Sequence, residues 1–358
     1  MGIRTTVLFL VSALSVPTVV HASAAGRPTE VRFPVKSAVH SEVAVLSPAE
    51  KKLSLPLPIE PLKRVAILVP GTLNSLMPGS ISLGDFPNLH QRNPYFSETV
   101  VAAFESQGYA TYVVQGLEWC GQLERNGDLT LAEIRRWYSE HYPKGDARIT
   151  IVAHSAGGFY ALQALTQAPD LPVDQLYLLS TPLEGLKLAN DIMNSPVVGD
   201  IVQKVVDQAA GLFDLRGLTA MTTAKTHEFL AHVRIPEHVR VYAIGGSQPV
   251  NWNPFELFNP DYLSPIFFAS ANWIGEESDG VLELHSALNS GGFRIPAIES
   301  GKSVPIQVIP EIHMRLDHIK QFLDYRFFTL LGTQHLENIR DEQARIYGAI
   351  VQRALGQP

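Results

Sequence analysis

Ser155 stands at the junction between an apolar run at residues 148–153 and a helical pattern at residues 156–167. It is the central residue of Ala-His-Ser-Ala-Gly, which begins at Ala153 and ends at Gly157. A Gly-x-Ser-x-Gly turn between a strand and a helix projects a serine hydroxyl from the top of a sheet, because small neighbours give steric clearance. Ala153 replaces the first glycine, and a single methyl group still suits such a turn. The motif therefore predicts a nucleophilic serine.

Three segments together resemble the α/β-hydrolases of the lipase and esterase type. They are Val-Pro-Gly-Thr at 69–72, the elbow at 153–157, and Leu-Ser-Thr-Pro-Leu-Glu-Gly at 179–185. The elbow with a leading alanine is similar to that of some small bacterial lipases. Ser-Asp-Gly-Val-Leu at 278–282 is similar to the acid-bearing segment of secreted triacylglycerol lipases. The resemblance covers residues 64–331 and implies an α/β-hydrolase fold.

A serine nucleophile needs a base within hydrogen-bond reach and a carboxylate that orients this base. In an α/β-hydrolase the acid and then the histidine follow the serine along the chain. Asp279 suits the acid, because Gly280 and an apolar stretch follow it, and the family resemblance points to the same residue. The competing carboxylates are Glu276, Glu277 and Asp261.

The base is expected after the last strand of the fold, which the apolar run at 306–309 predicts. His318 resembles the family position most closely, and His313 is the alternative. His154 is expected to pack under the elbow, since adjacent side chains of a strand point to opposite sides. Asp317 is interpreted as a solvated neighbour or as a helix cap.

Acyl transfer places negative charge on the former carbonyl oxygen, and two backbone N–H groups can stabilise this charge. Ala156, directly after the nucleophile, is expected to supply the first donor. The second donor comes from the loop after the first predicted strand, where we expect Thr72, with Leu73 as the alternative. Gly71 allows this loop to approach the substrate closely.

The sequence predicts no metal site and no cofactor. It contains no His-Glu-x-x-His, no phosphate-binding Gly-Lys-Ser loop and no dinucleotide fingerprint after a strand. Many secreted bacterial lipases hold calcium with a carboxylate two residues after the catalytic histidine, but Lys320 occupies this position. The single cysteine, Cys120, excludes an intrachain disulfide and a thiolate cluster.

The composition is typical of a globular protein. Of 358 residues, 46% are hydrophobic and 18% are charged, and the net charge is −7. A negative chain has no long-range attraction for nucleic acid, so we expect no nucleic-acid partner.

The first 24 residues resemble a secretory signal peptide. Arg4 precedes an apolar run at 7–20, and small residues follow at 22–25. The run is shorter than the roughly 20 apolar residues that a membrane span needs. We therefore expect a secreted or periplasmic protein with a signal peptide at 1–24, a Pro-rich leader at 25–61 and an α/β-hydrolase domain at 62–358.

Apolar runs alternate with helical stretches from residue 64 onward, which predicts a mostly parallel sheet with helices on both faces. Strands are expected at 65–69, 110–114, 148–153, 175–179, 239–244 and 306–309. Helices are expected at 95–107, 130–141, 156–167, 319–331 and 337–355, the second of them opened by a Thr130 and Glu133 capping pair. Two segments fall outside this alternation and are interpreted as substrate-facing insertions. Residues 186–232 form a helical, lid-like insertion, and residues 250–274 are rich in Trp, Phe, Pro and Asn.

Together these features imply a serine ester hydrolase that forms an acyl-enzyme. The apolar insertions favour a hydrophobic ester substrate and transient contact with a lipid interface. An acyltransferase would use the same nucleophile and the same oxyanion donors, so it remains an alternative. A catalytically inactive binding protein with this fold is the third interpretation.

Overall fold

The computed structural model describes residues 63–72, 95–118, 121–195, 219–247, 274–318, 320–322 and 333–357. The predicted signal peptide and the Pro-rich leader lie outside the described residues. So do Cys120, Leu73 and Asp261, and all but the last residue of the 250–274 insertion. Among the helices of the described ranges, none has the length and apolar character needed to cross a bilayer.

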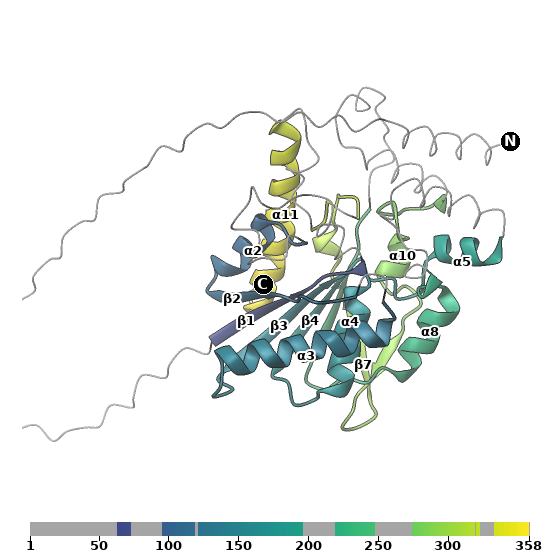
Figure 1. Cartoon of the computed structure of the whole chain (residues 1–358). Helices are drawn as coiled ribbons and strands as arrows, with labels where there is room; N and C mark the ends of the chain where they lie inside the picture. The colour runs from purple at the N-terminus through teal and green to yellow at the C-terminus, as the bar shows by residue number, and fades with distance from the viewer. Residues whose placement is uncertain are drawn as a thin grey trace, which may run out of the picture. The chain divides into compact units, whose positions relative to one another are not determined.

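A seven-stranded sheet lies at the centre of the described residues (Figure 1). Its strands are β1 (Lys63–Val69), β2 (Tyr109–Val113), β3 (Ala147–His154), β4 (Val173–Leu179), β5 (Arg240–Ile244), β6 (Arg294–Pro296) and β7 (Ser303–Val308). Their spatial order is β2-β1-β3-β4-β5-β7-β6, and only the edge strand β6 is antiparallel to its neighbour. The predicted parallel sheet is confirmed. The sequence pattern does not predict β6, because a strand of 3 residues gives no measurable alternation.

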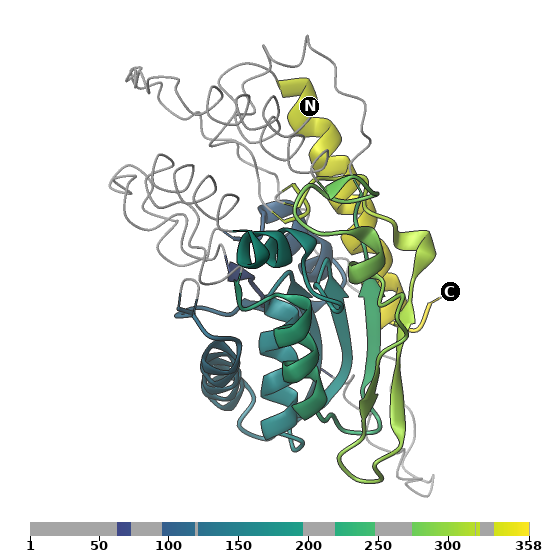
Figure 2. The ribbon, with the colours of Figure 1, turned by 90° about the vertical axis from the view of Figure 1, so that its right-hand side faces the viewer.

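Helices cover both faces of the sheet. α3 (Leu123–His141), α4 (Gly157–Gln167) and α8 (Thr223–His232) pack on one face, and α2 (Glu98–Glu105) and α11 (Thr333–Ala354) on the other. Figure 2 shows α11, in yellow, on the opposite side of the sheet from α4 and α8. Alternate strand residues enter the two cores: Ile67 faces α3 and α4, whereas Leu68 faces α2 and α11. Burial on both faces explains the continuous apolar runs in the sequence.

Three short helical elements complete the described fold: α5 (Lys187–Asn194), α10 (Leu284–Ala287) and the 3-10 turn η5 (Pro310–Ile312). α5 and α8 both fall in the predicted 186–232 insertion, whose residues 196–218 lie outside the description. Phe229 of α8 packs edge-on against Phe159 of α4, with 5.4 Å between ring centroids. α8 therefore acts as the crossover helix between β4 and β5.

The helix predicted at 130–141 begins earlier than expected. α3 starts at Leu123, and Thr130 is a buried residue in its interior instead of an N-cap. Asn126 and Gly127 are weak helix formers, which makes the first turns look like a loop in the sequence. Asn126 is compensated by tertiary contacts, because its amide accepts from the Glu118 N–H and donates to the Glu118 carbonyl at 2.8 Å each.

The helix predicted at 319–331 is wrong over residues 320–322, which form a turn. In a helix their carbonyls would accept hydrogen bonds from residues four positions later. Here each carbonyl accepts from a distant residue. The three pairs are Lys320 with Gln343 Nε2, Gln321 with the Tyr347 hydroxyl, and Phe322 with the Ser97 N–H. Residues 323–332 lie outside the description.

Candidate active site

Ser155 lies on a tight turn between β3 and α4. Its φ of 56° is in the left-handed region, which places the residue in a strained conformation. The Ser155 N–H donates to the Leu179 carbonyl at 2.8 Å, which holds the turn to β4. A Cβ atom at Gly157 would lie only 2.5 Å from the Val69 carbonyl oxygen and 2.7 Å from that of Pro70. Glycine is therefore required at position 157, because the end of β1 and the residue after it lie so close.

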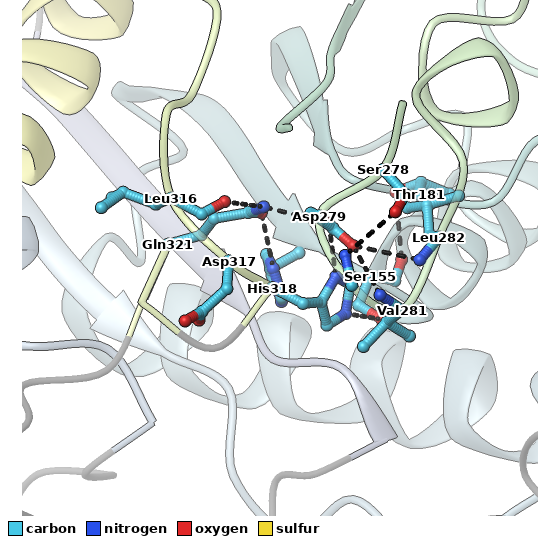
Figure 3. A network of polar contacts seen from close by, with 12 residues as sticks. Ser155, Thr181, Ser278, Asp279, Val281, Leu282, Leu316, Asp317, His318 and Gln321 are labelled. Atoms are coloured by element: carbon cyan, nitrogen blue, oxygen red, sulfur yellow. Dashed lines mark hydrogen bonds and ion pairs between the residues drawn. The ribbon is translucent and has the colours of Figure 1, made fainter. Parts of the chain in front are cut away.

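The structure brings Ser155, His318 and Asp279 together (Figure 3). His318 Nε2 lies 2.9 Å from Ser155 Oγ, and His318 Nδ1 lies 2.8 Å from Asp279 Oδ2. The exposed fractions are 7% for Ser155, 4% for His318 and 0% for Asp279. The His318 N–H also donates to the Asp279 carbonyl at 3.0 Å, so backbone contacts tie the two loops together.

Both oxygens of the Asp279 carboxylate accept hydrogen bonds. Oδ1 accepts from the N–H groups of Val281 and Leu282 at 3.1 and 3.0 Å. Burial by itself raises the pKa of Asp279, but His318 and these N–H groups outweigh it and lower the pKa below its usual value. Asp279 is therefore an anion at neutral pH. It accepts the proton on His318 Nδ1, which leaves Nε2 to accept from the Ser155 hydroxyl.

The alternative acid Glu277 and the alternative base His313 meet at a different serine. The Ser247 hydroxyl donates to Glu277 Oε1 at 2.7 Å and lies 2.7 Å from His313 Nε2. Glu276, the other described competitor, is a surface residue whose Oε2 lies 3.2 Å from His285 Nδ1. The hydrogen bonds and ion pairs of these three candidates are therefore made with residues other than Ser155.

Asp317, next to His318, is buried with an exposed fraction of 1%, so its interpretation as a solvated neighbour is wrong. Its Oδ1 accepts the Lys320 N–H at 2.8 Å and caps the turn at 320–322. Its Oδ2 lies 2.7 Å from Lys320 Nζ, and this ion pair is almost fully buried. Lys320 thus provides the positive charge next to Asp317.

The two predicted oxyanion donors belong to segments that meet at Ser155. Ala156 is fully buried at the start of α4. Thr72 follows Gly71 in the loop after β1, and a Cβ atom at Gly71 would lie 2.8 Å from Ser155 Cβ. The loop that carries Thr72 therefore runs directly beside the predicted nucleophile.

Sequence reasoning missed one residue that contacts Asp279. Gln321 Nε2 donates to Asp279 Oδ2 at 3.0 Å, and Gln321 is fully buried. In the helix predicted at 319–331 this glutamine would be an ordinary polar position. Its amide points inward because the segment forms a turn whose carbonyls accept hydrogen bonds from side chains of α11. Such a long-range contact leaves no pattern in the sequence around Gln321.

A third buried carboxylate, Glu283, lies where the Asp279 loop meets α5. Glu283 is 2% exposed, and its Oε1 accepts the Lys187 N–H at 2.9 Å. Within the described residues, Oε2 has no hydrogen-bond partner. Burial raises the pKa of Glu283, although the backbone N–H contacts oppose the shift. Folding therefore makes the Glu283 carboxyl easier to protonate than it is in the unfolded chain.

Glu283→Gln is expected to stabilise the protein above neutral pH. A carboxyl with a raised folded pKa contributes most stability below its unfolded pKa of about 4.3, and loses it as the pH rises through the folded pKa. Glutamine keeps the neutral shape at every pH, so the gain in Tm is largest near pH ~8 and vanishes near pH ~4.

Thermal melts at the two pH values check this expectation. Glu276→Gln is the matched control, because the Glu276 side chain is 48% exposed and should change Tm little at either pH. An equal change in Tm at both pH values for Glu283→Gln would show that ionisation of Glu283 has no part in stability.

The sheet order, the left-handed serine turn after β3 and the helices on both faces define an α/β-hydrolase fold. No protein-family model matches the sequence, and no curated protein matches it.

Among solved structures, the chain is similar to a carboxyl esterase from a metagenome. The identity is 17% and the TM-score 0.52, over 85% of this chain and 80% of the other. It is also similar to the lipase of Staphylococcus hyicus, with 11% identity and a TM-score of 0.52, over 83% of this chain and 98% of that lipase. At these identities the likeness shows the fold alone.

Proposed function

We propose that this protein is a secreted serine carboxylic ester hydrolase of the esterase or lipase type, with Ser155, His318 and Asp279 as its catalytic residues. The observation that carries the proposal is the continuous hydrogen-bond line from Ser155 Oγ through His318 to the buried Asp279 carboxylate. Nucleophile, base and orienting acid are within the distances that acyl transfer requires.

In the first half of the reaction, Ser155 Oγ attacks the ester carbonyl carbon while its proton passes to His318 Nε2. The buried Asp279 anion stabilises the imidazolium that forms. The N–H groups of Thr72 and Ala156 are proposed to bind the oxyanion of the tetrahedral intermediate. When the intermediate collapses, the bond to the alcohol breaks, and His318 transfers its proton to the departing oxygen. The acyl group stays on Ser155.

In the second half, water takes the place of the alcohol. His318 removes a proton from the water as the water oxygen attacks the acyl carbon, and a second tetrahedral intermediate forms. Its collapse breaks the bond to Ser155 Oγ, which recovers its proton from His318 Nε2. The carboxylic acid leaves, and the enzyme returns to its starting state.

A hydrophobic ester is the proposed substrate. The apolar character of the predicted insertions at 186–232 and 250–274 supports this choice. The names of the two similar structures, a carboxyl esterase and a lipase, agree with an ester bond as the target. Secretion or export to the periplasm is proposed from the signal-like residues 1–24.

A fluorophosphonate probe tests the proposal, because it reacts with a serine activated by a neighbouring base. We expect the probe to label Ser155 and to stop p-nitrophenol release from short and medium acyl esters, as measured by peptide mapping and absorbance. Ser247→Ala is the matched control, since Ser247 also contacts a histidine and a carboxylate. Labelling of Ser247 in place of Ser155, or no labelling of folded protein, would contradict the proposal.

A further inference from the structure

A chain of buried side chains leads away from Asp279 on the side opposite Val281 and Leu282. Gln321 Nε2 donates to Asp279 Oδ2 at 3.0 Å, and Gln321 Oε1 lies 3.1 Å from His154 Nε2. The Tyr95 hydroxyl lies 2.8 Å from His154 Nδ1. Gln321 and His154 are fully buried, and Tyr95 is 4% exposed.

The chemistry of the partners sets the direction of every hydrogen bond in this chain. An ionised Asp279 can only accept, so the Gln321 NH₂ group faces it and the Gln321 carbonyl faces His154. His154 must therefore carry its proton on Nε2, which leaves Nδ1 to accept from the Tyr95 hydroxyl. Burial raises the pKa of Tyr95 well above its usual value, so this hydroxyl keeps its proton.

The chain also reaches the loop that carries Thr72. The Tyr95 hydroxyl interacts with the Gly71 backbone, and a Cβ atom at Gly71 would lie 2.9 Å from this hydroxyl. The same buried network thus connects the loop proposed to bind the oxyanion with the carboxylate proposed to orient the base.

His154 lies close to His318, with 4.6 Å between ring centroids. Burial first, and then the charge of His318, hold the pKa of His154 well below its usual value. His154 therefore stays neutral when His318 takes up a proton. A neutral His154 adds no repulsion to the imidazolium, and its Nε2–H remains available to Gln321.

Packing holds the Gln321 amide from other sides as well. A Cβ atom at Gly246 would collide with Gln321 Nε2, so only glycine leaves room for the amide there. The ring of Phe322, the next residue, stacks on Tyr95 with 3.9 Å between centroids and lies 4.5 Å from the His154 ring. These contacts leave the amide little freedom to rotate.

We propose that Gln321 is a positioning residue for the reaction: held by His154, it fixes the orientation of the Asp279 carboxylate toward His318. Gln321 contacts neither Ser155 nor the substrate carbonyl in this role. It acts by holding Oδ2, the oxygen that also accepts from His318 Nδ1, in one place. The inference rests on the proposed ester hydrolysis by Ser155.

The test uses Gln321→Met, which keeps the side-chain volume but removes the hydrogen bonds to Asp279 and His154, together with the longer one from Nε2 to the Leu316 carbonyl at 3.4 Å. We expect kcat for p-nitrophenyl esters to fall by about 10- to 100-fold, the range for one hydrogen bond to a charged group. KM is expected to stay near the wild-type value, because Gln321 is fully buried and the proposal gives it no contact with the substrate.

Gln175→Met is the matched control. Gln175 is also buried, and its amide likewise uses both ends: Oε1 accepts from the Tyr177 hydroxyl and Nε2 donates to the Ala354 carbonyl. It lies on β4, in the half of the strand away from Ser155, so its loss should lower Tm without lowering kcat. Equal effects on kcat from Gln175→Met and Gln321→Met would overturn the proposal.

His154→Phe provides a second, independent variant. It keeps an aromatic ring but removes the Nε2–H that orients Gln321, so kcat is expected to fall with little change in KM. The double variant with Gln321→Met should lose no more kcat than the worse single variant, because both act on the same hydrogen-bond chain. Losses that multiply would show that His154 does not act through Gln321.

Proton NMR gives a readout that does not depend on turnover. The resonance of the proton between His318 Nδ1 and Asp279 should shift in Gln321→Met and in His154→Phe, and stay in place in Gln175→Met. An unchanged resonance in both variants would overturn the inference.

If wild-type protein hydrolyses no ester, the proposed function fails. If hydrolysis depends on Ser155 but kcat is insensitive to Gln321, only the present inference fails.

Discussion

Ser155→Ala is expected to lower kcat for p-nitrophenyl ester hydrolysis by about 10⁶-fold, the loss seen when a serine nucleophile is removed from an otherwise intact site. Alanine has no oxygen to attack the carbonyl carbon, so no acyl-enzyme can form. The fold should survive, because the backbone N–H of residue 155 still donates to the Leu179 carbonyl and alanine is smaller than the serine it replaces.

The measurement compares wild type and Ser155→Ala over a series of acyl chain lengths. Ser247→Ala is the control for removal of a serine hydroxyl beside a histidine, and it should retain wild-type kcat. Retained hydrolysis by pure Ser155→Ala would contradict the assignment of the nucleophile. The chain-length series on wild type also identifies the acyl group that the enzyme prefers.

Asp279→Asn is expected to lower kcat by about 10⁴-fold, the effect of the same change in a serine protease. An asparagine that keeps Oδ1 toward Val281 and Leu282 must turn its NH₂ group toward His318 Nδ1 and Gln321 Nε2. Both of these groups are donors in the native arrangement. His318 must then present a protonated Nε2 to Ser155, and it can no longer accept the hydroxyl proton.

Asp317→Asn is the control for this substitution. Asp317 is a buried carboxylate next to His318 in the sequence, but it pairs with Lys320. Its replacement should lower Tm, because the buried ion pair with Lys320 is lost, whereas kcat should stay far above that of Asp279→Asn. A similar loss of kcat in both variants would mean that the general charge of the region matters, not the contact with His318.

The alternation of strands and helices is encoded locally, which is why most of the fold could be predicted. β1, β3 and β4 are apolar runs because helices bury both of their faces, and this composition can be recognised without knowing the partners. The failures have a common cause. The start of α3 depends on the contact of Asn126 with Glu118, and the turn at 320–322 depends on carbonyl contacts with residues far along the chain.

By itself, the sequence predicted Ser155 as the nucleophile, because a strand, a tight turn and a helix that follow one another are a local pattern. It also restricted the acid and the base to a few residues after Ser155. Only the tertiary structure shows that Asp279 and His318 are hydrogen-bonded in line with Ser155, whereas Glu277 and His313 contact Ser247, and only it revealed the contact of Gln321 with Asp279. These contacts join loops from different strands, whose carboxyl ends meet at one edge of the sheet, and such long-range proximity has no periodicity that a sequence could display.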